Sequence, residues 1–196
     1  MRPFRGFGPI HNEASALASR DWILSLDSDE VMSSELIREL ENLKPQAGVV
    51  YSLQRDNYFN GKRIRCCSGW YPDLVFRLYN RKTTRFSDDA VHERVLTEGL
   101  KIIPLKYSVR HTPYRNVHDI LTKMQTYSTL FAEQNKNKKR SSFAHAIFHG
   151  AFSFWKSYLL KRGLLGGKEG LIISMYIGQT AFYKYLKLAE LNKKSD

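Results

Sequence analysis

A short apolar run that ends in a cluster of acids is the feature that most constrains the fold of this chain. Residues 22–27 read Trp-Ile-Leu-Ser-Leu-Asp, and residues 27–30 read Asp-Ser-Asp-Glu. A compact apolar run of this length is typical of a strand buried on both faces. The acids would then lie at its carboxyl end, where open α/β sheets bind their ligands.

The segments around this run alternate between helical and extended patterns. We expect helices at 12–20, with Asn12 as the N-cap, and at 35–43, capped by Ser33 or Ser34. Further strands are expected at 48–54, 74–79 and 101–109, with a hairpin turn at Asn60-Gly61. This order predicts an α/β sheet.

Beyond about residue 115 the pattern becomes helical and aromatic. Helices are expected at 117–134, 143–161 and 170–190, with a basic linker at 135–142. We therefore divide the chain into a sheet domain, residues 1–115, and a helical domain, residues 116–196. Charge-free stretches in the second part are shorter than the ~20 apolar residues that span a bilayer.

The net charge of +12 lies entirely in the second half of the chain. Basic surfaces of this kind bind anionic partners: nucleic acid, anionic lipid or a phosphorylated glycan. Cys66 and Cys67, the two cysteines, are adjacent, which argues against a structural disulfide framework.

Asp27 and Asp29 form the first candidate site. Two carboxylates one residue apart can hold a divalent cation that also bridges substrate phosphates. The alternative is a polar turn that caps the next helix.

A second group of candidate residues lies between 55 and 94. Trp70, Tyr71, Asp73 and Arg77 suit a sugar, because aromatic rings cover its apolar face while charged groups bond its hydroxyls. The alternative is a partly buried aromatic cluster with a surface salt bridge.

Four titratable groups stand within six positions at the end of this region: Asp88, Asp89, His92 and Glu93. This density suits a general base or a further metal ligand. Alternatively, Glu93 pairs with Arg94 or Arg77.

The helical half offers a candidate surface for an anionic membrane, because its helices combine a wide apolar, aromatic-rich face with basic flanks. Its residues are Lys136, Lys138, Lys139, Arg140, Trp155, Lys161 and Arg162. The alternatives are ordinary core helices packed on the sheet and a solvated basic loop.

Taken together, the chain resembles bacterial family 2 glycosyltransferases of the lipopolysaccharide core type, and is similar to heptose glucosyltransferases. The resemblance runs through GFGPIHNEASALASRDWILSLDSDE, RDNYFNGKRIR, GWYPDLVFRLYNR, RFSDDAVHERV and SYLLKRGLLGGKEGLIISMYIGQTAFYKYLKL. It covers nearly the whole chain in order, and the motifs are specific as a set.

The resemblance implies a GT-A (Rossmann-like) mixed sheet, incomplete in this chain, with a C-terminal helical appendage. It implies a hexosyltransferase that inverts the anomeric carbon, with a nucleotide-diphosphate sugar donor, UDP-glucose above all, and a lipopolysaccharide core acceptor. It also implies a peripheral location on the cytoplasmic face of the bacterial inner membrane, with no nucleic-acid partner.

Residue roles carry over by position. Asp27 and Asp29 would hold Mg²⁺ or Mn²⁺, and His92 would reach the metal or the leaving diphosphate. Asp89 or Glu93 would be the base. The acceptor side would be lined by Trp70, Tyr71, Asp73 and Arg77.

Enzymes of this family begin with an N-E-E-type strand and a further strand–helix unit, both of which would precede Met1 here. We therefore expect a truncated chain. A non-catalytic remnant of such an enzyme is the second hypothesis. A basic nucleic-acid-binding module is the third, although the chain lacks a recognisable signature for one.

Overall fold

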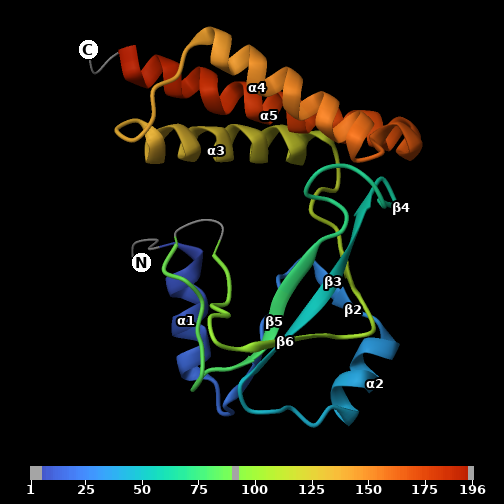
Figure 1. The fold of residues 1–196 in the computed structure, drawn as a ribbon. Helices are drawn as coiled ribbons and strands as arrows, with labels where there is room; N and C mark the ends of the chain where they lie inside the picture. Colours follow the sequence, from blue (N-terminus) through green and yellow to red (C-terminus); the bar gives the residue numbers. More distant parts are fainter. Residues whose placement is uncertain (1–5, 90–92, 194–196) are drawn as a thin grey trace. The chain divides into compact units, whose positions relative to one another are not determined.

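The fold was obtained as a computed structural model that describes residues 6–89 and 93–193. The chain forms two compact units: a sheet unit, Met1–Asp56 with Asp73–His111, and a helical unit, Asn57–Pro72 with Thr112–Asp196. The predicted α/β class is confirmed, with a mixed sheet and a C-terminal helical region that are compatible with an incomplete Rossmann-like fold (Figure 1). The domain boundary at residue 115 stays a prediction.

The sheet follows the order β1-β5-β3-β7-β2. Its strands are β1 (Trp22–Leu24), β2 (Glu30–Met32), β3 (Val49–Phe59), β5 (Leu74–Asn80) and β7 (Val109–His111). β6 (Lys101–Pro104) runs parallel to β3, whereas β5 is antiparallel to both β1 and β3. The sheet is therefore mixed.

The predicted strand at 22–27 is wrong in two respects. β1 ends at Leu24, and its residues are half-buried rather than buried on both faces. The reason is its place at the end of the sheet order, where β5 is its paired neighbour.

Local signals explain most element boundaries. α2 (Ser34–Asn42) begins after Ser33, whose hydroxyl accepts a hydrogen bond from the Leu36 amide at 3.1 Å, as the cap prediction requires. Asn60 and Gly61 both have positive φ, and they connect β3 to β4 (Lys62–Arg63) in a tight hairpin. The predicted cap and turn are confirmed.

The cap predicted at Asn12 is wrong. α1 spans Phe7–Leu17, so Asn12 lies inside it. The Asn12 side-chain amide instead exchanges two hydrogen bonds with the backbone of Phe86, at 3.0 and 2.9 Å. Asn12 therefore anchors the loop after β5 to α1.

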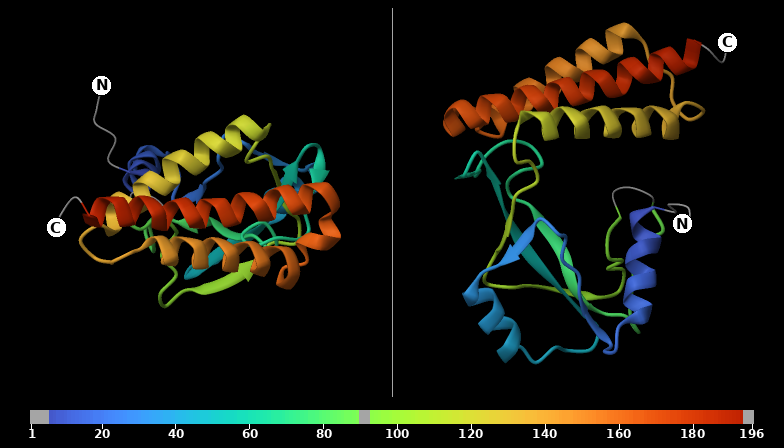
Figure 2. Two further views of the ribbon diagram at one scale, coloured as in Figure 1. Left: turned by 90° about the horizontal axis from the view of Figure 1, so that it is seen from above. Right: turned by 180° about the vertical axis from the view of Figure 1, so that it is seen from behind.

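The helical unit contains three long helices. They are α3 (Val117–Asn135), α4 (Phe143–Trp155) and α5 (Gly167–Lys193), and α5 lies alongside both others (Figures 1 and 2). A π-helical turn, Lys156–Leu160, and a 3₁₀ turn, Gly163–Gly166, connect α4 to α5.

Small residues let α4 and α5 approach closely. A Cβ atom at Gly150 would lie 2.9 Å from Phe182 Cβ, and one at Gly178 would lie 2.9 Å from Phe154 Cβ. In the described part of the chain, no helix is both long enough and apolar enough to cross a membrane.

Candidate active site

The acidic turn after β1 forms the centre of the site. The Asp27 amide donates to Glu30 Oε2 and the Glu30 amide donates to the Asp27 carbonyl, both at 3.0 Å, so the turn is closed by its own bonds. The Glu30 side chain is 0% exposed, whereas those of Asp27 and Asp29 are 35% and 38% exposed. Two acids are thus accessible beside a third that is buried.

Arg77 on β5 holds this turn. Its Nη2 donates to Asp27 Oδ2 and, at 3.0 Å, to Glu30 Oε1. The arginine is itself buried, with 6% of its surface exposed. One guanidinium therefore fixes the orientation of both carboxylates.

Arg55 on β3 extends the cluster. Its Nε and Nη2 donate to the two carboxylate oxygens of Asp73 at 2.9 and 3.1 Å, and its Nη1 lies 3.5 Å from Glu30 Oε1. Burial alone would lower the pKa of Arg55, but the hydrogen bonds to Asp73 raise it above its ordinary value. Three carboxylates are thus arranged around two permanent cations.

Asp29 has a different partner. Its Oδ2 lies 3.5 Å from Nε2 of His111, which stands opposite Glu30 where β2 pairs with β7. His111 is 8% exposed. Because the two aspartates contact different groups, each is positioned separately.

The acids of this turn are candidate ligands for a magnesium ion. The described ranges contain no group of three or more His, Cys, Asp or Glu side chains placed to hold a metal ion. Magnesium in nucleotide-binding sites, however, usually takes one or two carboxylates and completes its shell with water and substrate phosphates. Asp27 and Asp29, each about a third exposed, match that requirement. His92, the third predicted ligand, lies outside the described residues.

The predicted base Glu93 contacts a group that the sequence did not indicate. One of its carboxylate oxygens lies 3.9 Å from His11 Nε2. His11 Nδ1 lies 3.3 Å from the Ser25 hydroxyl, and the ring stacks on Phe86 at 4.3 Å between centroids. Glu93, His11 and Ser25 therefore form a polar chain that starts just after β1.

The other acids of that loop are placed differently. Asp88 accepts two hydrogen bonds from the Arg85 guanidinium, at 2.6 and 2.8 Å, which lower the pKa of its carboxyl. The Asp89 side chain is exposed, and its carbonyl accepts a hydrogen bond from the Gly8 amide at 3.2 Å. Asp88 is engaged in a surface pair, while Glu93 and Asp89 remain the two predicted bases.

The four predicted acceptor residues are divided between the two units. Asp73 and Arg77 belong to the ion cluster of the sheet unit. Trp70 is buried in the core of the helical unit, stacked on Tyr114 with 5.8 Å between ring centroids, and Tyr71 is exposed. The placement of Trp70 matches the alternative of a buried aromatic cluster.

The predicted membrane residues are exposed at two places of the helical unit. Lys136, Lys138, Lys139 and Arg140 lie between α3 and α4, where Lys139 Nζ stands 5.7 Å from the centroid of Phe131. Trp155 is the last residue of α4, and Lys161 and Arg162 lie between α4 and α5.

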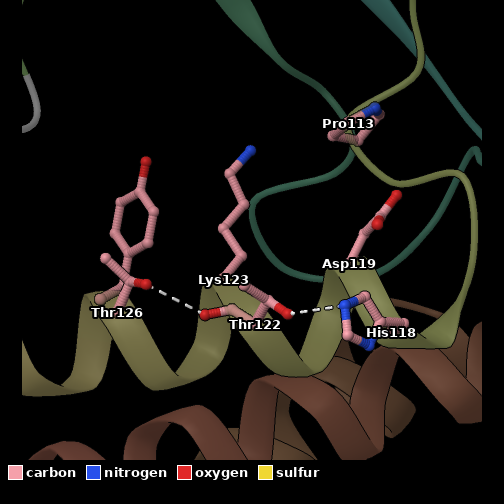
Figure 3. A pocket seen from close by; sticks show the side chains of 7 residues that line it. Pro113, His118, Asp119, Thr122, Lys123 and Thr126 are labelled. Carbon is pink, nitrogen blue, oxygen red and sulfur yellow. Dashed lines mark hydrogen bonds between the residues drawn. The ribbon is translucent and has the colours of Figure 1, made fainter.

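A shallow cavity of about 350 Å³ opens on α3 beside Pro113 (Figure 3). Its polar lining is largely bonded internally: His118 Nε2 lies 3.5 Å from the Thr122 hydroxyl, and Thr126 donates to the Thr122 carbonyl. None of its lining residues was predicted as a site residue. The cavity belongs to the helical unit, whereas the acidic turn belongs to the sheet unit.

Asp27, Asp29, Asp73 and Arg77 could be found from the sequence, but Glu30, Arg55, His111 and His11 were missed as site residues. Arg55 had a usable signal, because an arginine at the end of the apolar strand predicted at 48–54 is costly to bury without a partner carboxylate, here that of Asp73. His11 had none, because its role depends on the packing of α1 against the loop around Phe86.

No protein-family model matches the chain. It is similar to an uncharacterized glycosyltransferase of Rickettsia felis, with 26% identity over 98% of this chain and 71% of that protein. A second of that name, from Rickettsia bellii, is 25% identical over 100% of this chain and 69% of its own length. A third, from Rickettsia conorii, is 24% identical over 100% of the chain and 73% of the relative. The similarity therefore extends along the whole chain.

Proposed function

We propose that this protein is a glycosyltransferase that uses a nucleoside-diphosphate sugar as donor. The observation that carries the proposal is the pair of accessible acids, Asp27 and Asp29, on a turn held by buried Glu30 and Arg77. The rickettsial relatives are named uncharacterized glycosyltransferases, which supports sugar transfer in general.

In finer detail, the proposal is an inverting family 2 hexosyltransferase with a GT-A sheet. Its donor would be UDP-glucose and its acceptor a lipopolysaccharide core. An anionic membrane surface would be a further partner, because the acceptor is anchored in lipid and the helical unit carries the positive charge.

In this proposal Asp27 and Asp29 would hold Mg²⁺ or Mn²⁺. A bound divalent cation supplies charge neutralisation for a departing diphosphate. Arg77 and His111 would keep the two carboxylates in place, each through its own contact. Because Arg77 occupies one oxygen of Asp27, it limits how that carboxylate can turn.

Glu93 would take the proton from the attacking hydroxyl of the acceptor, with Asp89 as the alternative base. A carboxylate close to an imidazole suits this task, and one oxygen of Glu93 lies 3.9 Å from His11 Nε2. Direct attack by a deprotonated hydroxyl on the anomeric carbon breaks its bond to the diphosphate and inverts its configuration.

The test is metal-dependent donor binding by the full chain, measured by titration calorimetry with UDP-glucose and Mn²⁺. Wild type should bind only when Mn²⁺ is present, and Asp29→Asn should weaken binding at least about 10-fold through loss of a ligand. Asp21→Asn is the matched control, because this exposed acid pairs with Lys82 and should leave binding unchanged.

Two results would contradict the proposal. If wild type shows no Mn²⁺-dependent binding, the remnant hypothesis is favoured. If Asp29→Asn binds as wild type does, the acidic turn is not the donor site.

A further inference from the structure

The connection between α4 and α5 exposes an unusual amount of apolar surface. We call residues 155–166 the elbow. Five of its large apolar side chains are at least half exposed: Trp155 53%, Leu159 52%, Leu160 75%, Leu164 56% and Leu165 77%. An exposed cluster of this kind on a folded unit marks an interaction site.

The elbow exposes its apolar side chains although its backbone is held in place by the rest of the helical unit. Its inner face is buried through Ser157 and Gly163, and the Ser157 hydroxyl lies 3.0 Å from that of Ser174 on α5. The Lys161 carbonyl accepts a hydrogen bond from the Cys67 amide at 2.8 Å. With the inner face fastened in this way, the leucines are held on the outer face.

The charge within the elbow has one sign. The elbow contains Lys156, Lys161 and Arg162 and no acid, and it is followed by Lys168 and by Glu169, which pairs with Lys62. The apolar surface continues along α4 through Phe148 and Phe152, which are 64% and 52% exposed. Tryptophan, leucine and basic residues together form the combination that lies in the headgroup region of a membrane.

We propose that the elbow docks on an anionic lipid bilayer, with Trp155 and the leucines at the acyl boundary and the lysines at the lipid phosphates. Charge argues against a second copy of the chain, because two elbows face to face would bring together six positive charges. Leucine side chains argue against nucleic acid, which binds basic and stacking groups. The inference rests on the membrane partner named in the proposed function and adds which residues contact it. Membrane docking and sugar transfer can each be true without the other.

The experiment is flotation of the full chain with vesicles of phosphatidylcholine, with and without phosphatidylglycerol. Wild type should float mainly with the anionic vesicles. Leu160→Ser with Leu165→Ser should weaken partitioning by at least about 100-fold, from the transfer free energy of two leucines. Lys156→Gln with Lys161→Gln should weaken it about 30-fold on anionic vesicles only.

Matched controls lie in the sheet unit. Leu17 and Leu74 are 88% and 60% exposed, and Lys44 and Lys101 are exposed lysines. The double variants Leu17→Ser with Leu74→Ser, and Lys44→Gln with Lys101→Gln, should float as wild type does. These controls separate the elbow from general effects of hydrophobicity and charge.

The outcomes are decisive in both directions. The proposal is overturned if wild type fails to float, if the elbow variants float like the controls, or if the elbow instead holds a dimer. Light scattering tests the dimer, since Leu160→Ser with Leu165→Ser would then yield monomers. UDP-glucose binding should persist in the elbow variants, and flotation should persist in Asp29→Asn, so the two proposals can fail independently.

Discussion

Replacing Arg77 by methionine should strongly destabilise the sheet unit. Arg77 has 8% of its side chain exposed and bonds Glu30, whose side chain is 0% exposed. Removing one partner of such a buried pair costs ~3–5 kcal/mol, because the remaining charge is left in a poor environment. Arg55 Nη1 still lies 3.5 Å from Glu30 Oε1, so we expect the lower end, about 3 kcal/mol.

Arg85→Met is the matched control. Arg85 also donates two bonds, in its case both to the carboxylate of Asp88, but these two side chains are 54% and 66% exposed. Exposed pairs contribute little, because water and salt screen them. Two arginines with similar bonds should therefore differ widely in their effect on stability.

Urea-dependent hydrogen exchange of peptides from β1 and β5 is the appropriate assay. The chain has two compact units, and a global signal would mix their unfolding. Adding Glu30→Gln to Arg77→Met should recover part of the loss, because the buried charge is then also removed. The buried-pair reasoning is refuted if Arg77→Met destabilises the sheet unit no more than Arg85→Met does. It is also refuted if adding Glu30→Gln to Arg77→Met lowers the stability further, by the full cost of the second substitution.

Three further predictions concern the backbone and the helical unit. Gly61→Ala should cost about 1 kcal/mol in the β3–β4 hairpin, because φ is +75° there; exchange of the hairpin amides measures this. Gly170→Ala should strongly destabilise the helical unit, because a Cβ atom on Gly170 would overlap the Gly163 carbonyl oxygen. Gly48→Ala should destabilise the sheet unit far less, because nothing lies within 4 Å of a Cβ atom there; urea unfolding of both variants compares the two losses of stability. Burial raises the pKa of the Cys66 thiol to about 12. The folded thiol therefore keeps a proton that the unfolded chain releases near pH 8.5, and the free energy of unfolding should fall as pH rises from about 8.5 to 12. Cys66→Ala should flatten that decline in unfolding series under reducing conditions, and an unchanged slope would contradict it.

Elements with strong local signals were predictable. The cap at Ser33 and the turn at Asn60-Gly61 are determined by a few adjacent residues, and both are as expected. α1 was placed about five residues late, because Asn12 has the chemistry of a cap but bonds a loop more than 70 residues away. The local sequence cannot show whether an asparagine side chain caps its own helix or bonds a distant loop.

The π-helical and 3₁₀ turns of the elbow were also beyond sequence reasoning. The helix pattern of 143–161 continues through Lys156–Leu160, and nothing local marks the change of hydrogen bonding. The connection is closely packed, since a Cβ atom on Gly163 would approach the Ser157 carbonyl and the Ser174 hydroxyl within 3 Å. Such contacts between segments cannot be read from the helix pattern alone.

The site shows the same division between local and long-range determinants. Asp27 and Asp29 could be selected because they follow an apolar run, but Arg77 was assigned to a sugar rather than to Asp27. Its actual partner depends on the register of β5 against β1, in which Leu24 pairs with Leu78 and the Ser25 amide bonds the Arg77 carbonyl. A buried arginine–glutamate pair adds little net stability over apolar residues of similar size. What the pair does provide is orientation, since Arg77 holds Asp27 by the same guanidinium group that neutralises Glu30.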